Sequence, residues 1–243
     1  MKKLGLIFTA TLLLLVACVN NEEDNIVTLK FTHNWEGTPV TNQDFNAFKF
    51  TNANGEKISI DRLRYVVSNL NFIDGRNYHL VDVGENTGTL ITLQGIAPGS
   101  YNLKFRFGFL DAENQDGVYK DLNTVNFNVP TMLGGGYHYM QFDGKYLDTN
   151  AQEANFNYHA IRAVDRSNPD NLVFEDTSFE VDFGQVMVTN NGEIEIKMNI
   201  AEWFKNPNIW NLNELNTVLM PNFEAQKLMN SNGKSVFSLG EVN

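Results

Sequence analysis

The residues best suited to chemistry in this chain are its four histidines, because imidazole nitrogen is a common ligand for copper and zinc. His33 lies in phase with an alternating apolar pattern, His138 lies two residues before Met140, and His159 ends the run Phe156-Asn157-Tyr158-His159. Two or three convergent imidazoles suffice for copper(I), and the thioether of Met140, in the phase of His138, could assist. A lone histidine on an apolar strand face is more often a hydrogen-bonded core residue, which is the alternative for His33. We expect His79 to be structural.

Other chemistry has little support in the sequence. The chain has no Gly-Xaa-Ser-Xaa-Gly, phosphate-binding loop, His-Glu-Xaa-Xaa-His or haem-attachment motif, so we expect no enzyme. Asp111, Glu113, Gln115 and Asp116 place oxygen atoms at near-alternate positions, as calcium loops do. The bidentate acid and flanking helices of such a loop are missing, so a solvated loop is favoured.

The first 18 residues have the pattern of an export signal. Lys2 and Lys3 precede the apolar run 4–16, which is short for a membrane span. The following Leu15-Val16-Ala17-Cys18 resembles the lipobox of bacterial lipoproteins, which implies cleavage before Cys18 and lipid on its sulfur and new amino group. We therefore divide the chain into a signal peptide (1–17), a lipidated cysteine with an acidic tether (18–25) and one domain (26–243).

This division predicts a protein that contacts a membrane through its lipid anchor alone. No run after Cys18 approaches 18 apolar residues, and Cys18 is the only cysteine, so we expect no disulfide. The net charge of −11 argues against nucleic acid as a partner. We expect the outer membrane, at its periplasmic face or at the cell surface. The acidic run 22–24 is either a surface-export signal or a solvated linker.

The domain has the pattern of an all-β protein. Residues Leu63–Ile73 and Tyr78–Val83 flank Asp74-Gly75 and predict a central hairpin, in which Val66 and Leu70 face the core. Further strands are predicted by period-two alternation at 26–32, 89–93, 101–109, 137–147, 155–163, 179–189 and 193–200. The prediction is a single antiparallel β-sandwich, immunoglobulin-like or Greek-key, with a short helical C-terminal segment at 201–204 and 221–229.

The order of several short motifs resembles the MbnP-like copper-binding domain, a family of exported and often lipid-anchored bacterial proteins. The resemblance covers most of residues 26–239. Its pieces are Phe31-Thr32-His33, Arg64 to Leu70 with Asp74-Gly75, Gly99-Ser100-Tyr101 with Phe107-Gly108 and Asn114, Gly136-Tyr137 to Phe142-Asp143-Gly144, Phe156 to His159, Met220-Pro221-Asn222, and Asn232-Gly233 to Phe237.

The resemblance implies a β-sandwich that holds copper, as Cu(I), through histidines. By position, the family's histidines correspond to His33 and His159, whereas His138 is a third candidate on local chemistry alone. In some members a tryptophan near the first histidine is oxidised to kynurenine, which implies Trp35 as a modified or site-wall residue. That oxidation needs a separate haem-containing oxidase. Residues 131–134 depart from the family, whose members often carry tryptophans there.

Two functions remain open from the sequence. The first is a membrane-anchored copper-binding lipoprotein that captures copper or delivers it to an acceptor protein. The alternative is a metal-free, surface-displayed β-sandwich that binds a protein or glycan partner. In that case an aromatic platform is expected from four tyrosines, Tyr137, Tyr139, Tyr146 and Tyr158.

Overall fold

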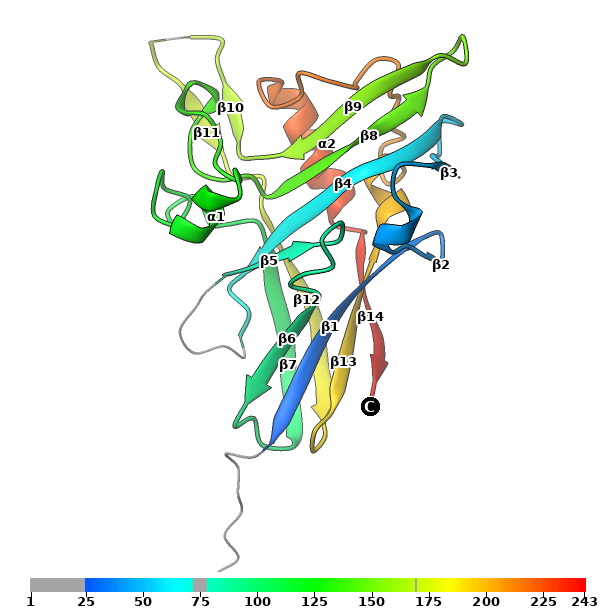
Figure 1. Cartoon of the computed structure of the whole chain (residues 1–243). Coiled ribbons are helices and arrows are strands. Elements are labelled where there is room, and N and C mark those ends of the chain that lie inside the picture. The colour runs from blue at the N-terminus through cyan, green and yellow to red at the C-terminus, as the bar shows by residue number, and fades with distance from the viewer. Residues whose placement is uncertain (1–24, 72–77, 169) are drawn as a thin grey trace, which may run out of the picture.

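The computed structural model describes residues 25–71, 78–168 and 170–243, and it shows two packed β-sheets with short helices at one end (Figure 1). The predicted signal peptide, Cys18, the acidic run and the Asp74-Gly75 turn lie outside these residues. Within the described part of the chain, no helix is long and apolar enough to cross a membrane.

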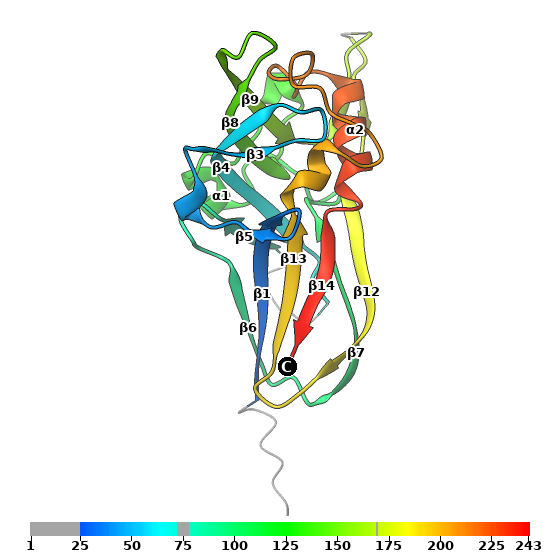
Figure 2. The same ribbon diagram turned by 90° about the vertical axis from the view of Figure 1, so that its right-hand side faces the viewer.

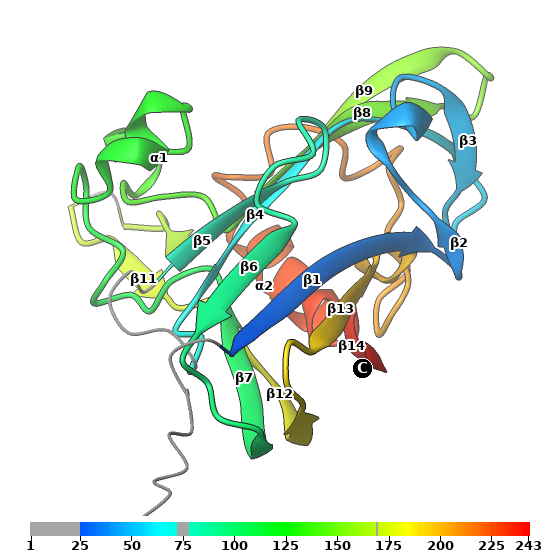
Figure 3. The same ribbon diagram turned by 60° about the horizontal axis from the view of Figure 1, so that its bottom comes forward.

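The first sheet is built around β1, in the order β14-β13-β1-β2, with β6 also paired to β1. Its strands are β1 (Ile26–Trp35), β2 (Thr38–Pro39), β6 (Leu90–Gln94), β13 (Glu193–Asn199) and β14 (Phe237–Val242). Figure 3 shows β1, β13 and β14 in one layer. The pairing of β1 with β13 is parallel, whereas the sequence predicted an antiparallel sandwich throughout. A parallel pair needs a long connection, and here almost the whole domain separates the two strands.

The second sheet is built around β4, which hydrogen-bonds to four other strands. Its order is β12-β7-β4-β8-β9, with β3 and β5 also on β4. The strands are β3 (Phe48–Thr51), β4 (Lys57–Ser68), β5 (Tyr78–Asp82), β7 (Gly99–Phe107), β8 (Met140–Leu147), β9 (Glu153–Ala160) and β12 (Phe179–Val188). The predicted pairing of β4 with β5 is confirmed, although β4 ends at Ser68 because Asn69 adopts a left-handed φ of 51°.

The prediction that Val66 and Leu70 face the core is confirmed, but the other phase of β4 is buried as well. Tyr65 packs against Phe31 of β1 with ring centroids 6.3 Å apart, so the phase of Tyr65 and Val67 faces the first sheet. Val66 lies on the opposite face and is also fully buried. Both faces of β4 are therefore covered near Val66, and alternation alone cannot show which of two buried phases points to the other sheet.

The smaller elements lie at the edges of the sandwich. They are α1 (Lys120–Thr124), α2 (Phe223–Gly233), β10 (Ala163–Asp165), β11 (Val173–Glu175) and the 3-10 turns Asn42–Asp44, Thr131–Leu133 and Ile200–Phe204. The predicted helical C-terminal segment is confirmed: α2 begins after Asn222, whose side chain accepts a hydrogen bond from the Ala225 amide. It packs against Ile200–Phe204 and the ends of β9 and β10 (Figure 2). The predicted strand 155–163 instead stops at Ala160, and Ala163–Asp165 pairs with β11.

The core between the sheets is dominated by aromatic rings. Phe31 meets Phe105 of β7 edge to face, with centroids 6.0 Å apart, and Trp35 stacks on Phe50 of β3 at 5.0 Å. The period-two pattern predicted for β7 is confirmed, since Leu103, Phe105 and Phe107 are all buried. Aromatic pairs of this geometry add to the free energy of burial.

The close approach of β4, β8 and β9 depends on Gly144. A methyl group there would collide with the Ser59 carbonyl and lie 2.7 Å from the Phe156 ring. We expect Gly144→Ala to lower the free energy of unfolding by about 1–3 kcal/mol, as overpacking does. Urea denaturation measures this change in the free energy of unfolding. Gly99→Ala is the matched control, because its new methyl group would lie 3.5 Å from the Tyr101 ring. Equal effects of the two substitutions would contradict this account.

Candidate metal centre

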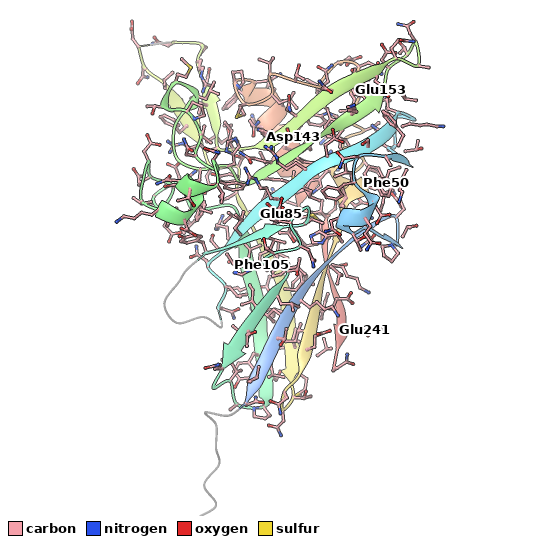
Figure 4. The ribbon with its side chains drawn as sticks, viewed as in Figure 1. Phe50, Glu85, Phe105, Asp143, Glu153 and Glu241 are labelled. Carbon is pink, nitrogen blue, oxygen red and sulfur yellow. The ribbon has the colours of Figure 1, made fainter. Side chains whose placement is uncertain are left out.

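Two rows of polar side chains cross the face of the second sheet that points away from β1. Strand register aligns Arg64 of β4, Gln141 of β8 and His159 of β9 in one row. It aligns Arg62, Asp143 and Asn157 in the next row. Figure 4 labels Asp143 on β8, between β4 and β9. Because side chains alternate across a strand, the members of both rows point to the same side.

His159 is oriented by Asp143. Burial raises the pKa of Asp143, but hydrogen bonds from His159 and Asn157 and the charge of Arg62 outweigh it, so this pKa is lowered overall. The ionised carboxylate can only accept, so His159 Nε2 donates to Asp143 Oδ1 at 2.7 Å. In the neutral ring Nδ1 then carries the lone pair, and this buried atom has no hydrogen-bond partner.

His138 is oriented by a backbone carbonyl. It precedes β8 in a segment that pairs with residues 127–129, where Asn128 bridges to Tyr137 and the His138 amide donates to Phe127 O. The same carbonyl lies 2.9 Å from His138 Nδ1, which must therefore carry the proton. Nε2 is left with its lone pair, buried and without a partner. Burial, followed by the neighbouring His159, lowers the pKa of His138 to about 3, so its ring is neutral at pH 7.

The two imidazoles are in contact. Their ring centroids lie 5.1 Å apart and their planes are nearly perpendicular, at 85°. Each ring has one nitrogen fixed by the protein and one unpartnered nitrogen, His138 Nε2 and His159 Nδ1. Among the described residues, no group of three or more His, Cys, Asp or Glu side chains is arranged to hold a metal ion. Two imidazole nitrogens are a ligand number that copper(I) accepts.

The charged residues around the two imidazoles form ion pairs with one another. Arg62 lies 3.3 Å from Asp143, and Arg64 lies 4.0 Å from Asp82. Gln141 accepts from Arg64 Nε at 2.7 Å and donates to Asn126 O at 3.1 Å, which ties the segment carrying His138 to the sheet. The sequence analysis did not identify Asp143 or Gln141 as site residues. The sequence does place both on one face, because they lie two residues apart in the predicted strand 137–147.

His33 lies elsewhere. Its Nε2 is 3.0 Å from the hydroxyl of Tyr65, which follows Arg64 on β4 and so points to the opposite face from His159. Burial lowers the pKa of His33 to about 4. The structure therefore does not bring His33 and His159 together. Trp35 lies on the same face of β1 as His33, and its Nε1 donates to Thr51 O at 3.1 Å.

Two expectations about neighbouring residues were wrong. Met140 pairs with Tyr65 and Ala160, so its thioether points to the opposite face from His159. The expected aromatic platform is absent from the surface, because all four of its tyrosines are buried: Tyr137, Tyr139, Tyr146 and Tyr158. Tyrosine in this chain fills the core, and the Tyr158 hydroxyl, for example, donates to Trp203 O at 2.9 Å.

Side chains of the acidic loop 111–116 bind other parts of the same chain. Asp111 pairs with Arg162 at 2.8 Å, and Asp116 accepts a hydrogen bond from the Gly136 amide. Neighbouring Asn114 accepts from the Tyr137 amide at 2.7 Å. Gly135 and Gly136, both at positive φ, leave room for these side chains, so the three glycines at 134–136 form a fixed turn.

His79, on β5, lies away from this loop in the chain, and its Nε2 is 2.8 Å from Gly88 O.

The fold and the site together define an all-β sandwich with two contacting imidazoles on its outer sheet face, of which His138 is buried and His159 is half-buried. The model of the MbnP family matches residues 24–221, and the chain belongs to that family. The resemblance seen in the sequence motifs is thereby confirmed. No curated protein and no solved structure matches the chain.

The two fully buried histidines make stability depend on pH. Burial lowers the pKa values of His33 and His138 from 6.5 to about 4 and about 3, so below pH 6.5 the unfolded chain binds more protons than the folded one. We expect the free energy of unfolding to fall by on the order of 2 kcal/mol per histidine between pH 8 and pH 5.

Urea denaturation at pH 8, 6 and 5 measures this dependence. His33→Asn and His138→Asn should each flatten the pH dependence. His79→Asn serves as the control and should leave most of it. A parent protein equally stable at pH 8 and pH 5 would contradict the buried, neutral state of these rings.

Proposed function

We propose that the protein is a copper-binding lipoprotein of the bacterial envelope that holds one copper(I) ion between His138 Nε2 and His159 Nδ1. Membership of the MbnP family points to a copper-related role. The observation that carries the proposal is the contact of two imidazoles, each with one buried nitrogen that lacks a partner.

The cost of these unpartnered atoms supports the proposal. A buried nitrogen without a hydrogen bond costs free energy, and the two here lie in adjacent rings. A bound metal ion would satisfy both nitrogens at once. The remaining nitrogens are already oriented by Asp143 and by the Phe127 carbonyl, an arrangement that protein metal sites commonly use to fix the ligand tautomer.

The chemistry of the pair suits capture or delivery of copper and not catalysis. Each ring is oriented by a hydrogen bond to one nitrogen, and the adjacent charges are paired with one another. We therefore assign His138 and His159 as ligands and Asp143 as a positioning residue. A separate copper acceptor, and a separate haem-containing oxidase that would modify Trp35, remain proposals from family resemblance.

In this proposal His33 and Trp35 are not part of the ion's coordination. The family resemblance predicts His33 as a ligand, but its Nε2 contacts Tyr65 on the other face of the sheet. The two assignments differ in what happens when single histidines are replaced, so one set of variants separates them.

Copper(I) titration against a chromogenic chelator tests the assignment. We expect one equivalent in the parent protein and none in His138→Phe or His159→Phe. Asp143→Asn should weaken binding about 10–100-fold, because it loosens the orientation of His159. His33→Phe is the matched control and should keep the copper.

Circular dichroism shows whether each variant is folded. Loss of copper in His33→Phe with full retention in His138→Phe would refute the assigned pair and favour the ligand set from family resemblance. A folded parent that retains no copper would refute copper binding and favour a metal-free binding module.

We also propose that a lipid on Cys18 anchors the protein to the outer membrane. Cys18→Ser should move it from the membrane fraction to the soluble fraction of lysed cells, because the lipid on the sulfur and amino group of Cys18 is the attachment point. Immunoblotting of the two fractions measures this, with His33→Phe as a variant that should stay in the membrane fraction. Membrane retention of Cys18→Ser would contradict the anchor.

A further inference from the structure

The edge of β1 contains a gap between two neighbouring strands. Its pairing with β6 ends at Lys30, and its pairing with β2 begins at Asn34. Residues 31–33 therefore have no strand beside them on this edge. A cavity of about 380 Å³ opens there, between β1, the segment 39–42 and the connection from β5 to β6. This volume lies within the range of small-molecule sites.

The walls of this cavity, the β1-edge pocket, are held to β1 by hydrogen bonds. On one side the Phe31 amide donates to Thr89 O at 2.8 Å. On the other side the Val40 amide donates to His33 O at 2.9 Å, and the next turn is fixed because Asp44 accepts from the Thr41 amide at 2.9 Å. The pocket is therefore formed before any ligand arrives, which reduces the entropy lost on binding.

Apolar side chains supply most of the exposed lining, polar residues such as Lys30 and Asn86 complete it, and one lining residue is a buried polar group. Phe31, Val40, Val83 and Leu90 supply the apolar surface, and His33 supplies the imidazole. The ring is 6 % exposed, and burial keeps it neutral. A neutral imidazole has one donor and one acceptor nitrogen, so the partner of Nε2 decides what the ring presents to the pocket.

Tyr65 decides the tautomer of His33. Within the described residues, the buried hydroxyl of Tyr65 has His33 Nε2 as its hydrogen-bond partner. Its proton would be left without an acceptor unless the hydroxyl donates to Nε2, and an unsatisfied buried donor is costly. Nδ1 then carries the ring proton. In the described part of the chain this nitrogen has no hydrogen-bond partner, yet it does not belong to the inaccessible nitrogen and oxygen atoms that lack one. It is therefore accessible, and its opening is the pocket that His33 lines.

We propose that the β1-edge pocket binds a small, largely apolar organic molecule that presents one hydrogen-bond acceptor to His33 Nδ1–H. The apolar walls would cover the body of the ligand, and the imidazole would orient its acceptor. This site is separate from the His138–His159 pair, since Tyr65 and Arg64 point to opposite faces of β4. The proposal does not depend on copper binding.

A pair of isosteric probes tests the proposal on the full protein by NMR titration. Acetophenone carries a carbonyl acceptor, and α-methylstyrene carries a methylene group in its place. We expect acetophenone to bind saturably, about three- to tenfold tighter than α-methylstyrene, and to shift the imidazole signals of His33. His33→Phe should remove the preference for acetophenone.

Two further variants keep the test decisive. Leu90 is 55 % exposed at the rim, so Leu90→Trp should fold and should weaken acetophenone binding by filling the pocket. His138→Phe should leave binding unchanged. No saturable binding to the parent, equal affinity for the two probes, or unchanged affinity in Leu90→Trp would overturn the proposal.

Discussion

The alternation of side chains across β4 is the constraint on which both sites depend. Arg64 and Tyr65 are adjacent in sequence and point to opposite faces of the second sheet. The face of Arg64 carries His159 and meets the segment with His138, whereas the face of Tyr65 meets His33 of β1. A slip of one residue in this register would exchange the two faces, so the pairing of β4 on both edges fixes both sites at once.

His33, His138 and His159 follow the same design, each with a different partner. A carboxylate fixes His159, a backbone carbonyl fixes His138 and a phenol hydroxyl fixes His33. Carboxylate and carbonyl oxygens accept, so they leave a lone pair on the other ring nitrogen, which suits a metal ion. The phenol donates and leaves an N–H, which suits an organic acceptor. The partner of one nitrogen thus determines the chemistry of the other.

The sequence predicted the fold better than the site. Most strands were predictable because period-two alternation reports burial of one face directly, as in β7. In β4 the same signal identified the buried Val66 but did not show that the phase of Tyr65 faces the first sheet. It also cannot report that β1 pairs with β13 across the length of the domain. The C-terminal helix was predictable because its cap, Asn222, is local.

The sequence identified His138 and His159 as candidate ligands, but for a related reason it could not show that these two rings meet. His159 lies on a regular strand, but His138 precedes β8 and is positioned by contacts with Phe127 and Gln141. Because His138 lies before β8, the strand alternation that placed the Met140 thioether beside it does not apply. Pattern analysis locates residues that share one element, whereas this site is formed where an irregular segment folds onto a strand. The ligand assignment accordingly depends on long-range packing, whereas family position alone selects His33 and His159, both of which lie on regular strands.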